Sequence, residues 1–451
     1  MRSIGLGGVL AARRVVTRAL MRVPSPRLAM LGYLSYMAVG WVLLALPVSH
    51  QGGQSVRGLD ALFTSASALS TTGLGVVSTS GAFNLFGEMV ILMLIQAGGI
   101  GYMTLGSFVV LSSGKTLSDA RRGVGELSFS LPEGFRIEPF IRSVVMYTFV
   151  CELVGALALW AMFADAGTPR PLWDAIFHSV SAFCTAGFST FDDSLVAFRG
   201  HFGVNLVIDA LSLAGAVGFI VAVDLGRRVA GRTASMTLTS RIIVGVTMWM
   251  IAGGTVVLAL VDPEIRALPG KEQFLAALFQ STSACTTVGF NSVPVGAIGS
   301  ASTLVIVVLM LIGASPSGTG GGIKTTSVTA LFGVVRSTLR GTERVTFFGR
   351  EIPRYRIRQA MSAVVIYVSV LIVGLFALML TDARIGFEDL TFEAFSAIGT
   401  VGLSRGITGE LSDLGKLVVI GLMFVGRVGP LTLGLAFLSP RIRPTDADLA
   451  I

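Results

Sequence analysis

Long hydrophobic runs alternate with shorter polar segments along the whole chain. Eight of the runs come close to or exceed the ~20 residues that a helix needs to cross a bilayer. They lie at residues 28–48, 84–111, 139–164, 203–225, 241–261, 301–336, 358–381 and 415–438. No signal-peptide cleavage pattern accompanies the first run, which is therefore expected to be a retained span. The pattern predicts an all-α polytopic membrane protein with eight membrane-spanning helices.

A polar, glycine-centred phrase recurs in the connections after the first, third, fifth and seventh runs. Aligned on the central glycine, the copies share a Phe ten positions earlier, a Ser six, an Ala five and a Thr two positions earlier. The aligned glycines are Gly73, Gly187, Gly289 and Gly402. Such agreement is not expected by chance, so the chain is predicted to repeat one span–loop–span unit four times.

The repeats divide the chain into predicted segments. They are a cytoplasmic N-terminal segment 1–27, four repeat units at 28–111, 139–225, 241–336 and 358–438, and a cytoplasmic tail 439–451.

Each phrase follows a short apolar stretch, such as Leu59 to Leu69, that is too short to cross a membrane. It predicts a half-helix that dips in from outside and returns as extended backbone. Backbone carbonyls at membrane depth must be buried in protein or line a water-filled cavity. Four such segments around one pseudo-fourfold pore would meet that condition, and each half-helix would aim its negative C-terminal end at the pore.

Rings of backbone carbonyl oxygens can replace the hydration shell of a monovalent cation. Glycine allows the positive φ that turns successive carbonyls to one side. The phrases hold no carboxylate cluster, which argues against a divalent cation and favours K⁺, with Na⁺ as the competing ion. The predicted filter residues are Thr71, Thr72, Gly73, Leu74, Thr185, Ala186, Gly187, Phe188, Thr287, Val288, Gly289, Phe290, Thr400, Val401, Gly402 and Leu403.

Composition and charge support a membrane protein. Of the 451 residues 53% are hydrophobic and 13% charged, more apolar surface than a soluble protein could bury. Basic residues concentrate before the first run, after the second, fourth and sixth, and in the tail, so the positive-inside rule predicts that both termini are cytoplasmic. The net charge of +8 is then mostly a topology signal and indicates no nucleic acid. The arginine-rich loop 336–358 could also dock a partner or anionic lipid.

The phrases STTGLG, CTAGFS, TTVGFN and GTVGLS, each in a span–loop–span unit, resemble the Trk/Ktr/HKT superfamily of potassium transporters over nearly the whole chain. Eight spans are most similar to the Ktr membrane subunit. The resemblance implies one pore per chain, a homodimer, and a cytoplasmic KtrA-like ring of nucleotide-binding regulatory subunits. A glycine in every repeat implies K⁺ selectivity, whereas a single glycine per repeat implies weaker discrimination than in tetrameric K⁺ channels.

The sixth run is interrupted by IGASPSGTGGGIKTTS at 312–327, whose glycines and proline cannot hold a regular helix. A phosphate-binding loop is excluded because Ile323 separates Gly322 from Lys324 and no strand precedes it. A simple kink in a helix would need fewer glycine and proline residues than this segment holds. The resemblance implies that the segment is a gate below the filter. The predicted gate residues are Gly313, Ala314, Ser315, Pro316, Ser317, Gly318, Thr319, Gly320, Gly321, Gly322, Lys324 and Arg427.

Charged residues inside the runs are costly and should face the interior. The resemblance places Arg427 near filter and gate, where its charge would oppose cation passage; alternatively it is a structural arginine satisfied by helix-end carbonyls. Lys324 either contacts the gate or snorkels to the inner boundary. Glu152 and Asp209 could each pair with Arg427, bind a coupling ion or satisfy a neighbouring hydroxyl.

The leading hypothesis is potassium uptake across the cell membrane, by passive conduction or Na⁺-dependent flux, under control of a cytoplasmic partner. A less selective K⁺/Na⁺-conducting Trk-type subunit is the alternative. The three scattered histidines and three cysteines make no metal or disulfide pattern, and no acid–base constellation suggests an enzyme. A non-conducting scaffold would not need four filter phrases. No organic cofactor is expected in this chain; K⁺, and Na⁺ as a second candidate, are its expected ligands, and membrane lipid surrounds it.

Overall fold

The computed structural model describes residues 25–101, 104, 107, 111, 137–231, 235–429 and 432–434. Apart from Arg27, the basic residues of the N-terminal segment lie outside the described residues, as do those of the loop at 112–136 and of the tail. Parts of the second and eighth expected spans lie outside them too. The orientation of the chain in the membrane therefore stays a prediction.

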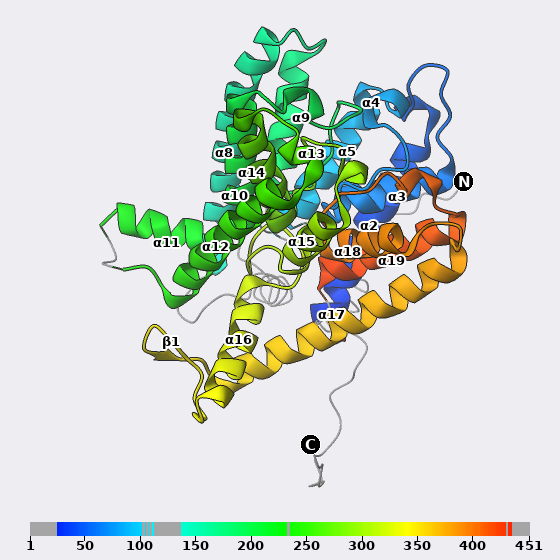
Figure 1. The fold of residues 1–451 in the computed structure, drawn as a ribbon. Helices are drawn as coiled ribbons and strands as arrows, with labels where there is room; N and C mark the ends of the chain where they lie inside the picture. Colours follow the sequence, from blue (N-terminus) through cyan, green and yellow to red (C-terminus); the bar gives the residue numbers. More distant parts are fainter. Residues whose placement is uncertain are drawn as a thin grey trace, which may run out of the picture.

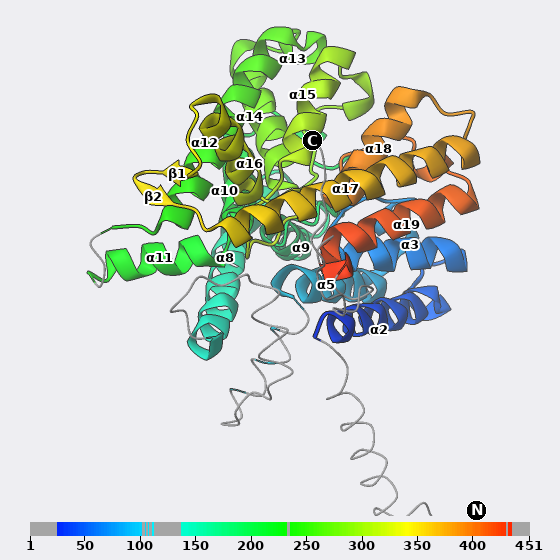
Figure 2. The same cartoon turned by 90° about the horizontal axis from the view of Figure 1, so that it is seen from below.

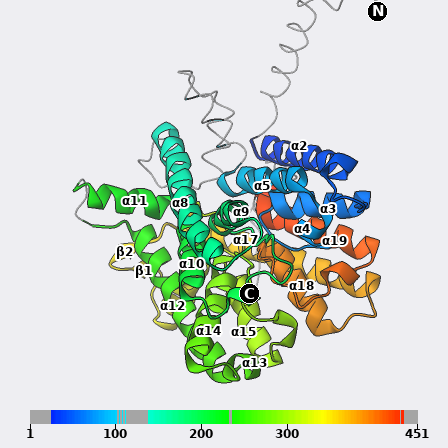
Figure 3. The same cartoon turned by 90° about the horizontal axis from the view of Figure 1, so that it is seen from above.

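The helices form four triplets, each with a long first helix, a short second helix and a third helix. Figures 1 and 3 show the triplets side by side around a common centre. In chain order they are α2 (Ser25–Ala45), α3 (Gly58–Leu69) and α5 (Leu85–Ile100); α8 (Ile137–Asp165), α9 (Pro171–Phe183) and α10 (Phe202–Val217); α12 (Leu238–Val261), α14 (Gly270–Thr286) and α15 (Ser300–Leu311); and α17 (Arg354–Thr381), α18 (Phe387–Gly399) and α19 (Asp413–Val428).

Smaller elements lie between the main helices, either within a triplet or between two triplets. Helices α11 (Phe219–Val229) and α16 (Thr325–Leu339) follow α10 and α15, and Figure 2 shows α11 projecting sideways from the bundle. An antiparallel hairpin of β1 (Thr346–Phe347) and β2 (Arg350–Glu351) precedes α17. Within the triplets, the described residues also form the short helices α4 (Thr79–Ala82) and α13 (Pro263–Arg266) and 3₁₀ helices at Pro47–Ser49, Val196–Phe198, Val295–Ala297 and Thr408–Glu410.

Four helices of the described chain are long and apolar enough to cross a membrane: Arg27–Ala45, Glu138–Asp165, Leu238–Val261 and Arg354–Thr381. They are the first helices of the triplets. Large apolar side chains such as Val39, Leu153, Trp249 and Phe376 are exposed on them, as expected for surfaces that face lipid rather than water. Helices α5 and α15 are apolar but shorter.

The fourth expected span is not one straight helix. Helices α10 and α11 meet at Gly218 and are bent by 97°, so they count as a fifth candidate span only if the broken pair is taken together. Gly218 has φ +91°, and a methyl group there would lie 2.7 Å from the Ser315 Oγ. The expectation of a continuous helix over 203–225 was wrong because another segment of the chain packs into the break.

The short helices form the buried centre. Their phenylalanines at the aligned positions, Phe63, Phe177, Phe279 and Phe392, are all buried. In the first three triplets a serine of the short helix donates a hydrogen bond to a backbone carbonyl of the long helix. The residue that carries this carbonyl stands three positions before a glycine of the long helix. The pairs are Ser65 Oγ to Met37 O at 2.8 Å, Ser179 Oγ to Glu152 O at 2.7 Å, and Ser281 Oγ to Ile251 O at 2.9 Å. Small residues at these crossings let the helices approach closely.

Candidate functional site

All four short helices end in the same hydrogen-bonded turn. The N–H of the aligned threonine bonds to the alanine carbonyl three residues earlier, and the next N–H bonds to the serine carbonyl five residues earlier. This is the Schellman motif, which usually places glycine in the left-handed position. Here the residue is threonine, with φ +52° at Thr71, +52° at Thr185, +60° at Thr287 and +48° at Thr400. A β-branched residue in that region is strained, and such strain concentrates at functional sites.

The central glycines close the four phrases into a ring. Gly73, Gly187, Gly289 and Gly402 all have positive φ, between +65° and +96°. A methyl group at each glycine would collide with the carbonyl oxygen before the glycine of the next triplet. The contacts run from Gly73 to Ala186 O, from Gly187 to Val288 O, from Gly289 to Val401 O, and from Gly402 to Thr72 O. The four phrases therefore form a closed cycle of backbone contacts, and no larger residue fits at the glycine positions.

The aligned serines brace this ring in different ways. Ser67 Oγ accepts from Gly73 N and Ser396 Oγ from Gly402 N, both at 3.1 Å. Ser283 instead donates to the carbonyl of Phe290 at 2.6 Å. Ser181 Oγ is buried and has no hydrogen-bond partner within the described chain. The ring is thus fourfold in its backbone but not in the side chains that support it.

The broken segment between α15 and α16 forms a compact loop. Ala314 N bonds to Gly321 O and Ile323 N to Leu311 O, both at 3.0 Å, so the loop closes on itself. The loop is also fastened to the break between α10 and α11. Its bonds there are Ser315 N to Ala216 O and Phe219 N to Ser317 O, both at 3.1 Å, and Ser315 Oγ to Val217 O at 2.5 Å. The loop therefore fills the space that the bend of the second triplet opens.

The same loop lies against all four strained threonines. Thr185 Oγ1 donates to Thr319 Oγ1 at 3.1 Å, and Thr71 Oγ1 lies 3.5 Å from Thr319 O. Thr287 Oγ1 accepts from Gly321 N at 3.0 Å. A methyl group at Gly321 would meet Thr400 Oγ1. Residues Thr319 to Gly321 thus lie directly at the end of the ring where the short helices end.

Two half-buried cations bind loop carbonyls. The Arg427 guanidinium, near the end of α19, donates through Nη1 to Thr319 O and through Nη2 to the carbonyls of Gly98 and Gly99 in α5. Lys324 Nζ donates to Gly320 O at 2.7 Å. Both predicted gate cations therefore contact the loop, and Arg427 also joins it to the first triplet.

The two carboxylates considered as partners of Arg427 lie elsewhere. Glu152 accepts from Gln96 Nε2 at 3.0 Å and lies 3.7 Å from the Cys184 Sγ. Asp209 makes no hydrogen bond to the residues that the structure describes. Of the three alternatives left open for Glu152 and Asp209, pairing with Arg427 is not observed among the described residues, because backbone carbonyls of Thr319, Gly98 and Gly99 accept from the guanidinium instead.

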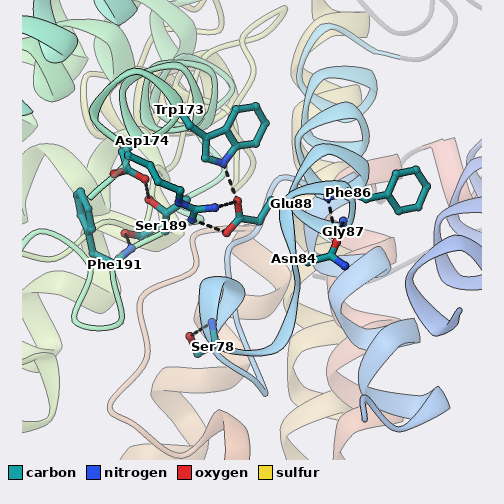
Figure 4. A network of polar contacts seen from close by, with 12 residues as sticks. Ser78, Asn84, Phe86, Gly87, Glu88, Trp173, Asp174, Ser189 and Phe191 are labelled. Atoms are coloured by element: carbon teal, nitrogen blue, oxygen red, sulfur yellow. Dashed lines mark hydrogen bonds and ion pairs between the residues drawn. The ribbon is translucent and has the colours of Figure 1, made fainter. Parts of the chain in front are cut away.

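Polar side chains tie neighbouring triplets together on the face where the short helices begin. The buried Glu88 carboxylate of α5 accepts from Arg170 at 2.7 and 2.9 Å and from Trp173 Nε1 at 2.6 Å, and Figure 4 shows Glu88 and Trp173 pointing toward one another. The other three junctions hold Arg199–Glu272, Ser300–Glu388, and the pairs Arg57–Asp413 and Lys416–Asp60. The sequence patterns did not reveal these ties, because each joins residues that are far apart along the chain.

Replacing Glu88 by glutamine is expected to lower the free energy of unfolding by ~2 kcal/mol, because a buried acceptor of three hydrogen bonds loses its charge. The apparent melting temperature of the purified protein in detergent measures this. Asp413→Asn is the matched control, since Arg57 and Asp413 are 61% and 59% exposed and such pairs contribute little. Equal melting temperatures for Glu88→Gln and the unchanged protein would contradict the expectation.

Comparison with known proteins bears on the role of this site. The family model TrkH, described as a cation transport protein, matches residues 39–443. The chain is 35% identical to the Ktr system potassium uptake protein B of Vibrio alginolyticus, over 93% of this chain and 92% of that protein. It is 34% identical to the protein of the same name from Bacillus subtilis, over 92% and 93% of the two chains.

Two further similarities agree. The chain is 32% identical to the potassium/sodium uptake protein NtpJ of Enterococcus hirae, over 91% of this chain and 92% of that protein. Its fold matches the crystal structure of the potassium transporter TrkH from Vibrio parahaemolyticus with a TM-score of 0.72 at 21% identity, covering 92% and 84% of the two chains. The chain therefore belongs to the TrkH family of cation transport proteins and not to a family of membrane enzymes.

Proposed function

We propose that this chain takes up K⁺ across the cell membrane through the ring formed by the four glycine phrases. The observation that carries the proposal is the closed cycle of contacts between each central glycine and the carbonyl before the next one. Four carbonyls held around one centre can replace the water of a monovalent cation. The names of the relatives, potassium uptake proteins of a Ktr system, support K⁺ as the ion.

The ring supplies only neutral oxygen ligands. The sixteen proposed filter residues, from Thr71–Leu74, Thr185–Phe188, Thr287–Phe290 and Thr400–Leu403, include no ionisable side chain. Neutral carbonyls suit a large, weakly hydrated cation better than a divalent one. A less selective K⁺/Na⁺ conductor is the second candidate, favoured by the likeness to a protein named for potassium/sodium uptake.

The loop 313–322 is proposed to be the gate. It lies across one end of the ring, where Thr319 and Gly321 contact threonines of three triplets by hydrogen bonds. The bound ion would have to pass this point, so the loop must move for conduction. Lys324 and Arg427 are proposed to hold the closed arrangement through their bonds to Gly320 and Thr319.

The wider architecture follows from the same proposal. Four span–loop–span repeats, eight membrane-spanning helices and cytoplasmic termini would place the ring near the outer face and the gate below it. By resemblance we also propose a homodimer, Na⁺-dependent uptake, and regulation by a cytoplasmic nucleotide-binding ring. Nothing in the proposed conduction path requires a nucleotide or another organic cofactor in this chain.

Uptake of ⁸⁶Rb⁺ into proteoliposomes that contain the purified protein tests the proposal. We expect uptake that unlabelled K⁺ abolishes at low concentration, because Rb⁺ and K⁺ would bind the same carbonyls. Na⁺ should reduce Rb⁺ uptake only at concentrations at least ~tenfold higher than those at which K⁺ does so. Equal competition by Na⁺ would favour the less selective alternative, and the absence of Rb⁺ uptake under every condition, with or without Na⁺ and a cytoplasmic partner, would refute conduction.

A further inference from the structure

Each short helix carries a polar residue nine positions before its central glycine: Thr64, His178, Gln280 and Glu393. None of the four side chains is more than 3% exposed. Burying polar groups is costly unless they are hydrogen-bonded. Their partners therefore show what these residues hold in place.

His178 fastens the segment that leaves the ring in the second triplet. Its Nδ1 lies 2.7 Å from the carbonyl of Asp174, which can only accept, so Nδ1 carries the proton. In the neutral ring Nε2 then accepts from Ser189 Oγ at 2.9 Å. Ser189 in turn accepts from Phe191 N at 2.9 Å, a bond that Figure 4 shows.

The His178 ring also links two triplets by stacking. Its centroid lies 4.7 Å from that of Phe191, and 5.8 Å from that of Phe290, with interplanar angles of 25° and 27°. Phe290 directly follows the central glycine of the third triplet. His178 therefore restrains the backbone of the ring in its own triplet and in the next.

Gln280 and Glu393 make the corresponding contacts with different chemistry. Gln280 Oε1 accepts from Ser292 N at 3.0 Å, three residues after the glycine. The Glu393 carboxylate accepts from Ser404 Oγ at 2.9 Å and from Thr408 Oγ1 at 2.5 Å. In three triplets, one aligned side chain thus joins the short helix to the segment that follows the ring.

Thr64 differs and supplies an internal comparison. Its hydroxyl donates to the Asp60 carbonyl of its own helix at 2.8 Å. That bond lies within α3 and does not reach the segment after Gly73. The first triplet therefore has a polar residue at the aligned position without the contact across the turn.

We propose that His178, Gln280 and Glu393 are positioning residues that set the preference of the ring for K⁺ over Na⁺. The inference rests on the proposed function of the ring as an ion filter. Whether selectivity arises from cavity size or from the field of the carbonyls, it depends on how firmly the backbone is held. If one of these side chains is lost, the ring is no longer held on that side and can contract around the smaller Na⁺. Its loss should therefore weaken the discrimination between K⁺ and Na⁺ more than it weakens conduction.

Glu393→Ala tests the proposal, with Thr64→Ala as the matched control. The concentration of Na⁺ that halves Rb⁺ uptake into proteoliposomes is expected to fall roughly tenfold in Glu393→Ala, the scale of one lost buried hydrogen bond. Thr64→Ala should leave it unchanged. Glu393→Gln keeps an acceptor oxygen and should restore most of the discrimination, which a merely structural role would not predict.

A second pair of variants covers the case in which Glu393→Ala does not fold. His178→Gln introduces the residue that the third triplet uses and should retain selectivity, whereas His178→Ala should lose it. Unchanged Na⁺ competition in folded Glu393→Ala or His178→Ala would overturn the proposal. Failure of the filter itself is distinguishable, because the unmodified protein would then show no preference between Rb⁺ and Na⁺, or no uptake.

Discussion

Replacing Gly289 by alanine is expected to reduce K⁺ uptake at least ~tenfold, because the added methyl group would be forced into the ring. Gly289 has φ +82°, a conformation that alanine adopts only with strain, and its Cβ would collide with the Val401 carbonyl. That carbonyl would have to leave its place at the centre. Rb⁺ uptake and its competition by Na⁺, measured at equal amounts of reconstituted protein, check the result.

Gly253→Ala is the control for this substitution. Gly253 lies in α12 of the same triplet, and a methyl group there would meet nothing within 4 Å. Its uptake should equal that of the unmodified protein. If Gly289→Ala folds and transports with unchanged rate and ion preference, the ring is not the path of the ion.

The repeated backbone structure of the ring could be predicted from the sequence. The alignment matched a threonine and a glycine in each phrase, and the structure gives all eight residues positive φ. The predicted half-helix from Leu59 to Leu69 agrees with the observed α3, Gly58–Leu69. The predictions of the turn and of the half-helix are both confirmed because they depend on neighbouring residues only: a short apolar helix is followed by a glycine that can adopt positive φ.

Side-chain contacts, between triplets or across a turn within one triplet, could not be predicted in the same way. Glu88 and Arg170 are 82 positions apart, and no periodic pattern relates them. Thr64 and Glu393 occupy aligned positions, but only Glu393 reaches the segment after the ring. Which polar side chain bonds within its helix and which bonds across a turn depends on packing that the hydrophobic pattern does not encode.

The bend at Gly218 could not be predicted from the sequence either. Residues 203–225 read as one apolar run, and glycine is common inside membrane helices. The break is stabilised by the loop that bonds to Ala216 and Val217 from another triplet. The interruption at 312–327 was visible because its glycines cluster, whereas its effect on a helix about a hundred residues earlier was not.

Replacing Arg427 by alanine is expected to raise K⁺ flux through the protein alone roughly tenfold. The guanidinium ties Thr319 of the loop to the Gly98 carbonyl of α5, so its loss frees the loop and also removes a positive charge beside the ring. Rb⁺ flux into proteoliposomes without any cytoplasmic partner measures the change. Unchanged flux and unchanged ion preference would contradict a role for Arg427 in the gate.

Arg427→Lys separates the two effects of the arginine. A lysine keeps the positive charge, but its single ammonium cannot bridge the loop and α5 as the planar guanidinium does. If charge is the barrier, Arg427→Lys should stay as closed as the unmodified protein while Arg427→Ala opens. If the bridge is the barrier, both variants should conduct more, because in each the bond between Thr319 and the first triplet is lost. We expect the second result. In either variant the Lys324 ammonium still donates to the Gly320 carbonyl, next to Thr319, so a positive charge remains at the loop.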